Sequence, residues 1–289
     1  MSAAIRTLGE RLVASPYGRF VGVELAAIEP GRVRLRLPAR ADTGNRSGTL
    51  HGGVTASLLD VAGTVAAASV APEIGDAGAS TIDLAVHYLA PSADEGVVVQ
   101  GMVTRRGREI VFVEATVVSD AGTPIARSAG VIRVGGPDAA DPPPSAPPCP
   151  IDATTHLVPW RSGSAFTARL GVLTASLAPG YAVLVLPARA ELCDAAGAMH
   201  EGALASLVDS AGGAASWSVD GFDARGRAAT IGMHLCYDRA PAGEDVVVEA
   251  RTSWRAAGIF LNTVMLTART SGRPVATGSV TYRIVRPET

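Results

Sequence analysis

The chain has 289 residues, is 47% hydrophobic, carries a formal net charge of −2 and spreads its 25 basic residues along its length. These values favour a globular protein of about two domains and exclude the clustered positive surface that nucleic-acid binding requires. All 25 basic residues are arginine, so chemistries that need a lysine amine, such as Schiff-base catalysis, are excluded as well.

The N-terminal segment, residues 1–20, has charged residues at helical spacing and lacks the apolar core of a signal peptide, so we predict a short helix there. The three cysteines, Cys149, Cys193 and Cys236, are odd in number and far apart. This spacing argues against both a disulfide framework and a zinc knuckle. The sequence therefore predicts a cytoplasmic protein with no structural disulfides.

A strand and a polar loop follow the first helix, and then comes a long apolar run from Val54 to Ala71. The run has the length of a membrane span, but it contains Asp60 and consists mostly of small residues. We interpret it as a buried helix of a protein with no membrane contact. Four segments of alternating or β-branched composition follow it and predict strands near residues 82–89, 97–105, 110–118 and 125–134.

A proline-rich stretch, residues 136–159, is predicted to be a linker that neither pairs in a sheet nor continues a helix. It separates two predicted domains, residues 1–135 and residues 160–289. The two domains repeat each other at a constant offset of 149 residues, which chance does not produce in three separate blocks. The matching blocks are SPYGRFVGV with SAFTARLGV, GRVRLRLPAR with GYAVLVLPAR, and HGGVTASLLDVAG with HEGALASLVDSAG.

The first repeat contains the pattern N-x-x-G-x-x-H-G-G, beginning at Asn45, followed by an acid in the sequence LLD. This pattern resembles the PaaI-type branch of the hotdog-fold acyl-CoA thioesterases, and the resemblance covers most of both repeats. It implies an α+β fold of two hotdog domains, each with a long central helix wrapped by an antiparallel sheet, docked as a pseudo-dimer within one chain. It also implies hydrolysis of an acyl-CoA thioester to a carboxylic acid and coenzyme A.

Thioester hydrolysis needs hydrogen-bond donors at the carbonyl oxygen and a base near the carbonyl carbon. Free N–H groups at a helix start suit the first task, and Gly52 opens the predicted helix. Asp60 lies eight residues further on, which is about 12 Å along the same helix. One helix cannot present both groups to one carbonyl, so the acid must come from a second, antiparallel helix. The other repeat supplies that helix.

In the resembled thioesterases the active sites lie between two hotdog units, which implies two composite sites here. The first would contain Asn45, His51, Gly52, Asp209 and Thr230. The second would contain Asp60, Thr81, Asp194, His200 and Glu201. In the second set, Asp194 replaces the asparagine of the pattern and Glu201 replaces its first glycine, so we expect this site to be weakened.

Several of these residues also have simpler interpretations. His51 and His200 would equally serve as helix caps, and Asn45 is also typical of a turn. Thr81 and Thr230 are ordinary strand residues. The acids Asp60 and Asp209 are harder to explain structurally, because an unpaired acid in an apolar helix costs several kcal/mol. Arg46 and the arginines of residues 105–108 could meet coenzyme A phosphates or simply lie in solvent.

We expect no metal ion and no cofactor, with coenzyme A present only as part of the substrate. The main alternative function is a non-catalytic acyl-CoA sensor, which loss of one site could produce. By analogy with paired hotdog dimers, we expect a homodimer of these double-length chains.

Overall fold

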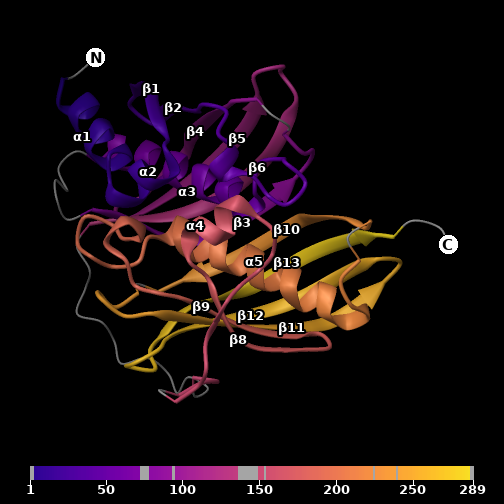
Figure 1. The fold of residues 1–289 in the computed structure, drawn as a ribbon. Coiled ribbons are helices and arrows are strands. Elements are labelled where there is room, and N and C mark those ends of the chain that lie inside the picture. Colours follow the sequence, from indigo (N-terminus) through magenta and orange to yellow (C-terminus); the bar gives the residue numbers. More distant parts are fainter. Residues whose placement is uncertain are drawn as a thin grey trace.

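The structure is a computed structural model, and it describes residues 3–71, 78–92, 95–135, 149–152, 154–223, 225–238 and 240–286. Within these ranges the chain forms two units of the same design, each with one long helix lying against its own antiparallel strands (Figure 1). The predicted α+β class, with two units docked within one chain, is confirmed.

The two units have the same order of elements. The first unit contains α1 (Ala3–Val13), α2 (Pro16–Val21), β1 (Glu24–Glu29), β2 (Arg32–Leu37), the short 3-10 helix η1 (Ala41–Thr43), α3 (Gly52–Ser69), β3 (Ala79–Tyr88), β4 (Val97–Arg106), β5 (Ile110–Ser119) and β6 (Pro124–Val134). The second unit contains β7 (Val158–Pro159), α4 (Ala165–Leu170), β8 (Leu173–Ala178), β9 (Tyr181–Leu186), η3 (Ala190–Leu192), α5 (Glu201–Asp220), β10 (Arg227–Tyr237), β11 (Val246–Ala256), β12 (Ile259–Ala268) and β13 (Pro274–Val285).

The four strands predicted after the apolar helix agree with β3 to β6 within a few residues. The single strand predicted before that helix is instead a hairpin of β1 and β2. The hairpin turn contains Gly31, whose φ of +74° lies in the left-handed region that glycine adopts without strain.

One sheet runs through both units. It has 13 strands in the order β1-β2-β4-β5-β6-β3-β10-β13-β12-β11-β9-β8-β7, and every neighbouring pair is antiparallel. The seam between the units is the pairing of β3 with β10, in which His87 lies opposite Gly232 and Asp83 lies opposite Cys236. Hydrogen bonds of the backbone therefore join the two units across their strand edges, as predicted.

The two long helices, α3 and α5, cross antiparallel between the two halves of the sheet (Figure 1). Near the crossing, Gly53 of α3 packs on Ser206 of α5, and Gly202 of α5 packs on Ser57 of α3. A Cβ atom on Gly53 would lie 2.5 Å from the Ser206 Cα, so only glycine permits this approach. The close crossing brings the start of each helix to the middle of the other.

The predicted linker is more structured at its end than expected. Residues 136–148 lie outside the described residues. Further along, Cys149, Ile151 and Leu157 pack on the second half of the sheet, against Val183, Val185 and Val247. The prediction that this stretch cannot pair in a sheet is wrong for β7, which pairs with β8 at the edge, where a proline is tolerated because one side of the strand needs no donor.

In the part of the chain that the structure describes, no helix is long and apolar enough to cross a membrane.

Candidate active site

His51 is the N-cap of α3 and its ring is buried. Its Nδ1 accepts a hydrogen bond from the Gly53 N–H at 3.0 Å, and its Nε2 lies 3.2 Å from the Thr167 hydroxyl of the second unit. Burial lowers the pKa of His51, although the Asp209 charge opposes this, so the ring is neutral near pH 7. A neutral ring that accepts at Nδ1 carries its proton on Nε2 and can donate it to Thr167.

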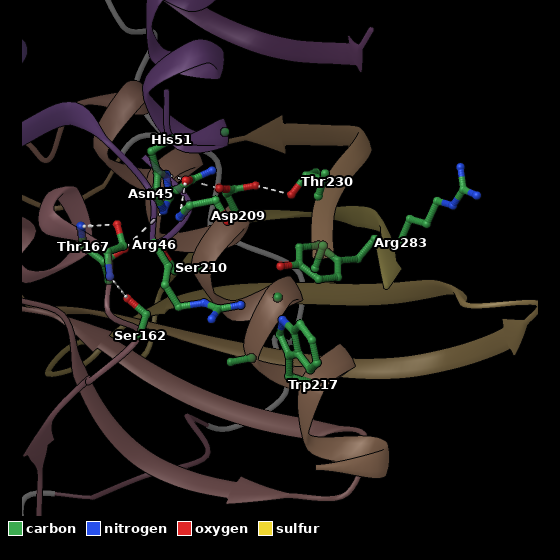
Figure 2. A pocket seen from close by; sticks show the side chains of 18 of the residues that line it. Asn45, Arg46, His51, Ser162, Thr167, Asp209, Ser210, Trp217, Thr230 and Arg283 are labelled. Atoms are coloured by element: carbon green, nitrogen blue, oxygen red, sulfur yellow. Dashed lines mark hydrogen bonds and ion pairs between the residues drawn. The ribbon is translucent and has the colours of Figure 1, made fainter. Parts of the chain in front are cut away.

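Asp209, in the middle of α5, meets the start of α3. Its Oδ2 accepts a hydrogen bond from the Gly53 N–H at 2.9 Å and lies 3.3 Å from the His51 Nδ1. Its Oδ1 accepts a hydrogen bond from the Thr230 hydroxyl at 2.5 Å. Figure 2 shows the side chains of His51, Asp209 and Thr230 in this arrangement. The structure therefore brings Asp209 and Thr230 of the second repeat to His51 and the helix start of the first.

Gly52 is the first residue of α3, so its N–H has no acceptor within the helix. A Cβ atom at this position would lie 2.8 and 2.9 Å from the two carboxylate oxygens of Asp209. The Tyr88 hydroxyl donates to the Gly52 carbonyl at 3.1 Å and holds this peptide in place. The N–H that bonds Asp209 is that of Gly53, a residue that sequence reasoning did not single out. Gly52 itself lines the cavity beside Asp209.

Asn45 shapes the loop before α3. Its Oδ1 accepts hydrogen bonds from the N–H groups of Ser47 at 2.8 Å and Thr49 at 3.2 Å, and its Nδ2 donates to the Thr49 hydroxyl at 2.7 Å. These are the contacts of a turn residue, which was one of the two interpretations of its side chain. Asn45 nevertheless also lines the cavity beside Asp209.

A cavity of about 980 Å³ opens at this group of residues. Its wall includes Gly52, His51 and Asp209, and it continues along α5 and β13 past side chains that sequence analysis did not predict. One of those side chains is on the residue directly after Asp209, the others are further along the chain, and no local pattern marks them as part of a cavity wall. They are Ser210, Trp217, Phe222 and Tyr282 (Figure 2 labels the first two).

The second predicted set is held by contacts that largely repeat those of the first. The Thr81 hydroxyl donates to the Asp60 Oδ1 at 2.5 Å, which matches the contact between Thr230 and Asp209. His200 caps α5 by accepting from the Gly202 N–H at 3.0 Å. Asp194 holds its loop as Asn45 does, by accepting from two backbone N–H groups. The structure thus brings this set together as well.

Glu201 makes the second set unlike the first. One donor atom from each of Asp60, His200 and Glu201 lies within 4.8 Å of the others, so two carboxylates and an imidazole share one place. Burial raises the pKa of Asp60 to about 6 and lowers that of His200 to about 4. Both shifts favour the neutral form of the group, so this environment disfavours charge. These are also donor types that metal ions use.

The second unit has a cavity beside Thr230. The corresponding region of the first unit, beside Thr81, is filled with aliphatic side chains. Tyr282 lies opposite Thr230 in the sheet, whereas the residue opposite Thr81 is Ile132. Ile132 belongs to a buried cluster with Val111, Val113, Val134, Ala67 and Ala71. Thr64, whose hydroxyl lies 3.3 Å from that of Thr81, occupies the position that Gly213 has in the second unit.

The raised pKa of Asp60 has a consequence for stability. A carboxyl group whose pKa rises on folding stabilises the folded state below its unfolded pKa, and this contribution is lost as pH rises through the folded value of about 6. The ionised acid then costs about 3 kcal/mol near pH 7. We expect Asp60→Asn, which can still accept from Thr81, to gain that stability relative to the wild type between about pH 4 and about pH 7.5. Urea unfolding of the variant and the wild type at the two pH values measures the difference in their free energies of unfolding. A difference that is the same at both pH values would contradict the prediction.

Comparison with known proteins gives the class. Residues 47–126 match the family model described as the thioesterase superfamily. A Halobacterium salinarum protein, provisionally named an esterase, is 36% identical over 107 residues, which are 36% of this chain and 70% of that protein. Human acyl-coenzyme A thioesterase 13 is 30% identical over 110 residues, which are 37% of this chain and 76% of that protein. The chain belongs to the thioesterase superfamily.

The whole chain also resembles a solved structure in its fold. A protein of unknown function with a hotdog fold from Alicyclobacillus acidocaldarius aligns over 98% of this chain and 99% of its own, with a TM-score of 0.67 and 13% identity. The predicted fold of two hotdog domains is therefore confirmed.

Proposed function

We propose that this protein is a PaaI-type acyl-CoA thioesterase built as a tandem repeat, which hydrolyses a thioester to a carboxylic acid and coenzyme A. The observation that carries the proposal is the placement of the Asp209 carboxylate at the start of α3, on the wall of a cavity of about 980 Å³. Membership of the thioesterase superfamily supports the reaction type. The relative named acyl-coenzyme A thioesterase 13 supports the choice of substrate class.

In the proposed mechanism the thioester carbonyl oxygen points at the Gly52 N–H, and Asp209 acts as general base. Asp209 takes a proton from a water molecule as the water attacks the carbonyl carbon. The tetrahedral intermediate carries its negative charge on the oxygen, which the N–H and the positive end of the α3 dipole stabilise. Collapse breaks the bond from carbon to sulfur, and coenzyme A leaves as the thiolate and takes up the proton that Asp209 received from the water, which returns Asp209 to its ionised form.

The surrounding contacts suit these roles. Thr230 donates to the Asp209 Oδ1 and holds the carboxylate in one orientation. The Gly53 N–H donates to both the His51 Nδ1 and the Asp209 Oδ2, and so holds the neutral ring beside the carboxylate. We propose that Asn45 acts indirectly, by fixing the loop that presents the helix start. The positioning of the base then depends on residues from both repeats.

A thiol-release assay over short, long and aromatic acyl-CoAs tests the proposal. We expect thiol release from at least one of these substrates without added metal or cofactor. Tight acyl-CoA binding with no thiol release from any of them would overturn the proposal and favour the sensor, which is a non-catalytic function.

We further propose that the second site is inactive or weak, because it holds Asp194 and Glu201 where the first holds Asn45 and Gly52. A double substitution, Asp194→Asn with Glu201→Gly, restores the residues of the first site and removes two negative charges. We expect it to raise kcat by at most about twofold, because one additional site per chain would become active. Steady-state kinetics with the best substrate measures this. A loss of activity would show that the two acids already contribute to turnover.

We also propose that two chains associate into a homodimer. Light scattering at micromolar protein concentration should then give twice the chain mass of 29.4 kDa. A single-chain mass at that concentration would contradict it.

A further inference from the structure

Three side chains of metal-binding type meet at the seam between the two units. Asp83 comes from β3 of the first repeat, and His234 and Cys236 come from β10 of the second. The His234 Nε2 lies 2.6 Å from the Asp83 Oδ2, and the Cys236 Sγ lies 3.5 Å from the same oxygen. One atom from each residue lies within 4.8 Å of the others.

The register of the seam places these residues on the outer face of the sheet. Asp83 lies opposite Cys236, and His234 is two residues from Cys236 and therefore on the same face. The neighbouring residues Leu84 and Leu235 are buried on the other face, toward the helices. The cluster is consequently separate from the cavity beside Asp209, and an ion can reach it from solvent.

The distances suit a single metal ion. In a tetrahedral zinc site, with bonds of about 2.0–2.3 Å, neighbouring ligand atoms lie about 3.3–3.6 Å apart. The Cys236 sulfur already has this spacing from the Asp83 oxygen. The His234 ring has to move by less than about 1 Å from its hydrogen bond with Asp83, and the side chains of His234 and Asp83 are 49% and 32% exposed, which leaves them room to adjust.

The cluster is not a by-product of the internal repeat. The counterparts of Asp83 and His234 at the offset of 149 residues are Gly232 and Ala85, neither of which has a ligand atom in its side chain. The counterpart of Cys236 is His87, which lies opposite Gly232. Three ligands therefore meet on one side of the pseudo-twofold axis, and a single imidazole occupies the other side.

We propose that the seam binds one Zn²⁺ ion through Asp83 Oδ2, His234 Nε2 and Cys236 Sγ, with water as the fourth ligand. A thiolate and an imidazole favour zinc over magnesium or calcium, which prefer oxygen ligands. Because the ligands come from both repeats, the ion would link the two units across the β3–β10 pairing and stabilise the folded chain. This role is structural and independent of the proposed hydrolysis.

Cobalt and zinc binding to the full-length protein, stripped of metal with a chelator and then freed of the chelator, tests the proposal. We expect one Co²⁺ per chain to give a thiolate-to-cobalt charge-transfer band in the near ultraviolet, and one Zn²⁺ to displace it. Zn²⁺ should also raise the Tm of the wild type, because the ion binds only the folded seam.

The variants Cys236→Ser and Asp83→Asn should each weaken zinc affinity by at least about a hundredfold, more than substitutions outside the ligand set do. Cys236→Ser should also remove the charge-transfer band. Cys149→Ser and His87→Ala are the matched controls, and both should retain the band and the affinity. Thiol release should not change on removal of zinc.

Two outcomes would overturn the proposal. The first is the absence of a charge-transfer band in the wild type. The second is zinc affinity that is equal in the wild type and in both ligand variants, which would place the ion elsewhere. Circular dichroism of each variant establishes that it is folded before its affinity is compared.

Discussion

Asp209→Asn is expected to lower kcat by on the order of a hundredfold or more. Asparagine keeps the shape of the side chain, and its one amide oxygen can still accept from the Gly53 N–H, which bonds one carboxylate oxygen in the wild type. The Thr230 hydroxyl, which donates to the other oxygen in the wild type, can turn and accept from the amide NH2. It cannot take a proton from water, so the general base is lost while the pocket is retained. Steady-state thiol release with the best acyl-CoA measures the loss in kcat, and KM should change little.

Asp60→Asn is the matched control for this variant, because the same change is made in the other repeat. We expect its kcat to stay close to that of the wild type, since Asp60 faces Glu201 and His200 instead of an open glycine. The reverse pattern, with Asp60→Asn inactive and Asp209→Asn mildly affected, would show that the second set of residues carries the chemistry. Equal losses in the two variants would show that both sites contribute.

Gly52→Ala is expected to lower kcat by roughly tenfold to a hundredfold. The new Cβ would lie 2.8 and 2.9 Å from the Asp209 oxygens, closer than such atoms approach, so the carboxylate has to move. The movement stretches its hydrogen bonds with Gly53 and Thr230 and misplaces the base relative to the helix start. Overall folding should survive, because the group that moves is the end of one side chain. Thiol-release kinetics and thermal unfolding measure the two effects.

Glu201→Ala tests the same position in the second repeat. That position already has a Cβ. Gly202 is the counterpart of Gly53, and among the described residues its N–H donates to the His200 Nδ1 and to no carboxylate. We therefore expect no loss of turnover from Glu201→Ala. Full activity of Gly52→Ala would contradict the idea that the close approach of Asp209 to the helix start is needed for catalysis.

The sequence was most informative about the repeat and the elements. The offset of 149 residues, the apolar run that became α3 and the alternating strands β3 to β6 are local or periodic features, so they can be read without a structure. Helix geometry alone also shows that one helix cannot present both Gly52 and Asp60 to one carbonyl. It led to the pairing of Gly52 with Asp209, and the structure places these two residues side by side.

Other features depend on how distant segments meet. Three features were not predicted, since composition does not show which surfaces remain to be covered. They are the hairpin of β1 and β2, the edge strand β7, and the packing of Cys149, Ile151 and Leu157 on the sheet. The proximity of Asp83 to His234 and Cys236 was missed for the same reason. Asp83 is far from the other two residues in the chain, and only the register of β3 against β10 makes them neighbours.

By itself, then, the sequence determined that the chain contains two similar units, each with a buried acid and a glycine-bearing helix start, because such patterns are written in neighbouring residues. The tertiary structure decided which N–H bonds Asp209, which side chains line the cavity and why the two sites differ. Each of these depends on distances between atoms of different elements. A Cβ on Gly52 would lie less than 3 Å from the Asp209 oxygens, so only the absence of that atom admits the carboxylate there, and Glu201 has a Cβ at the equivalent position of the other repeat.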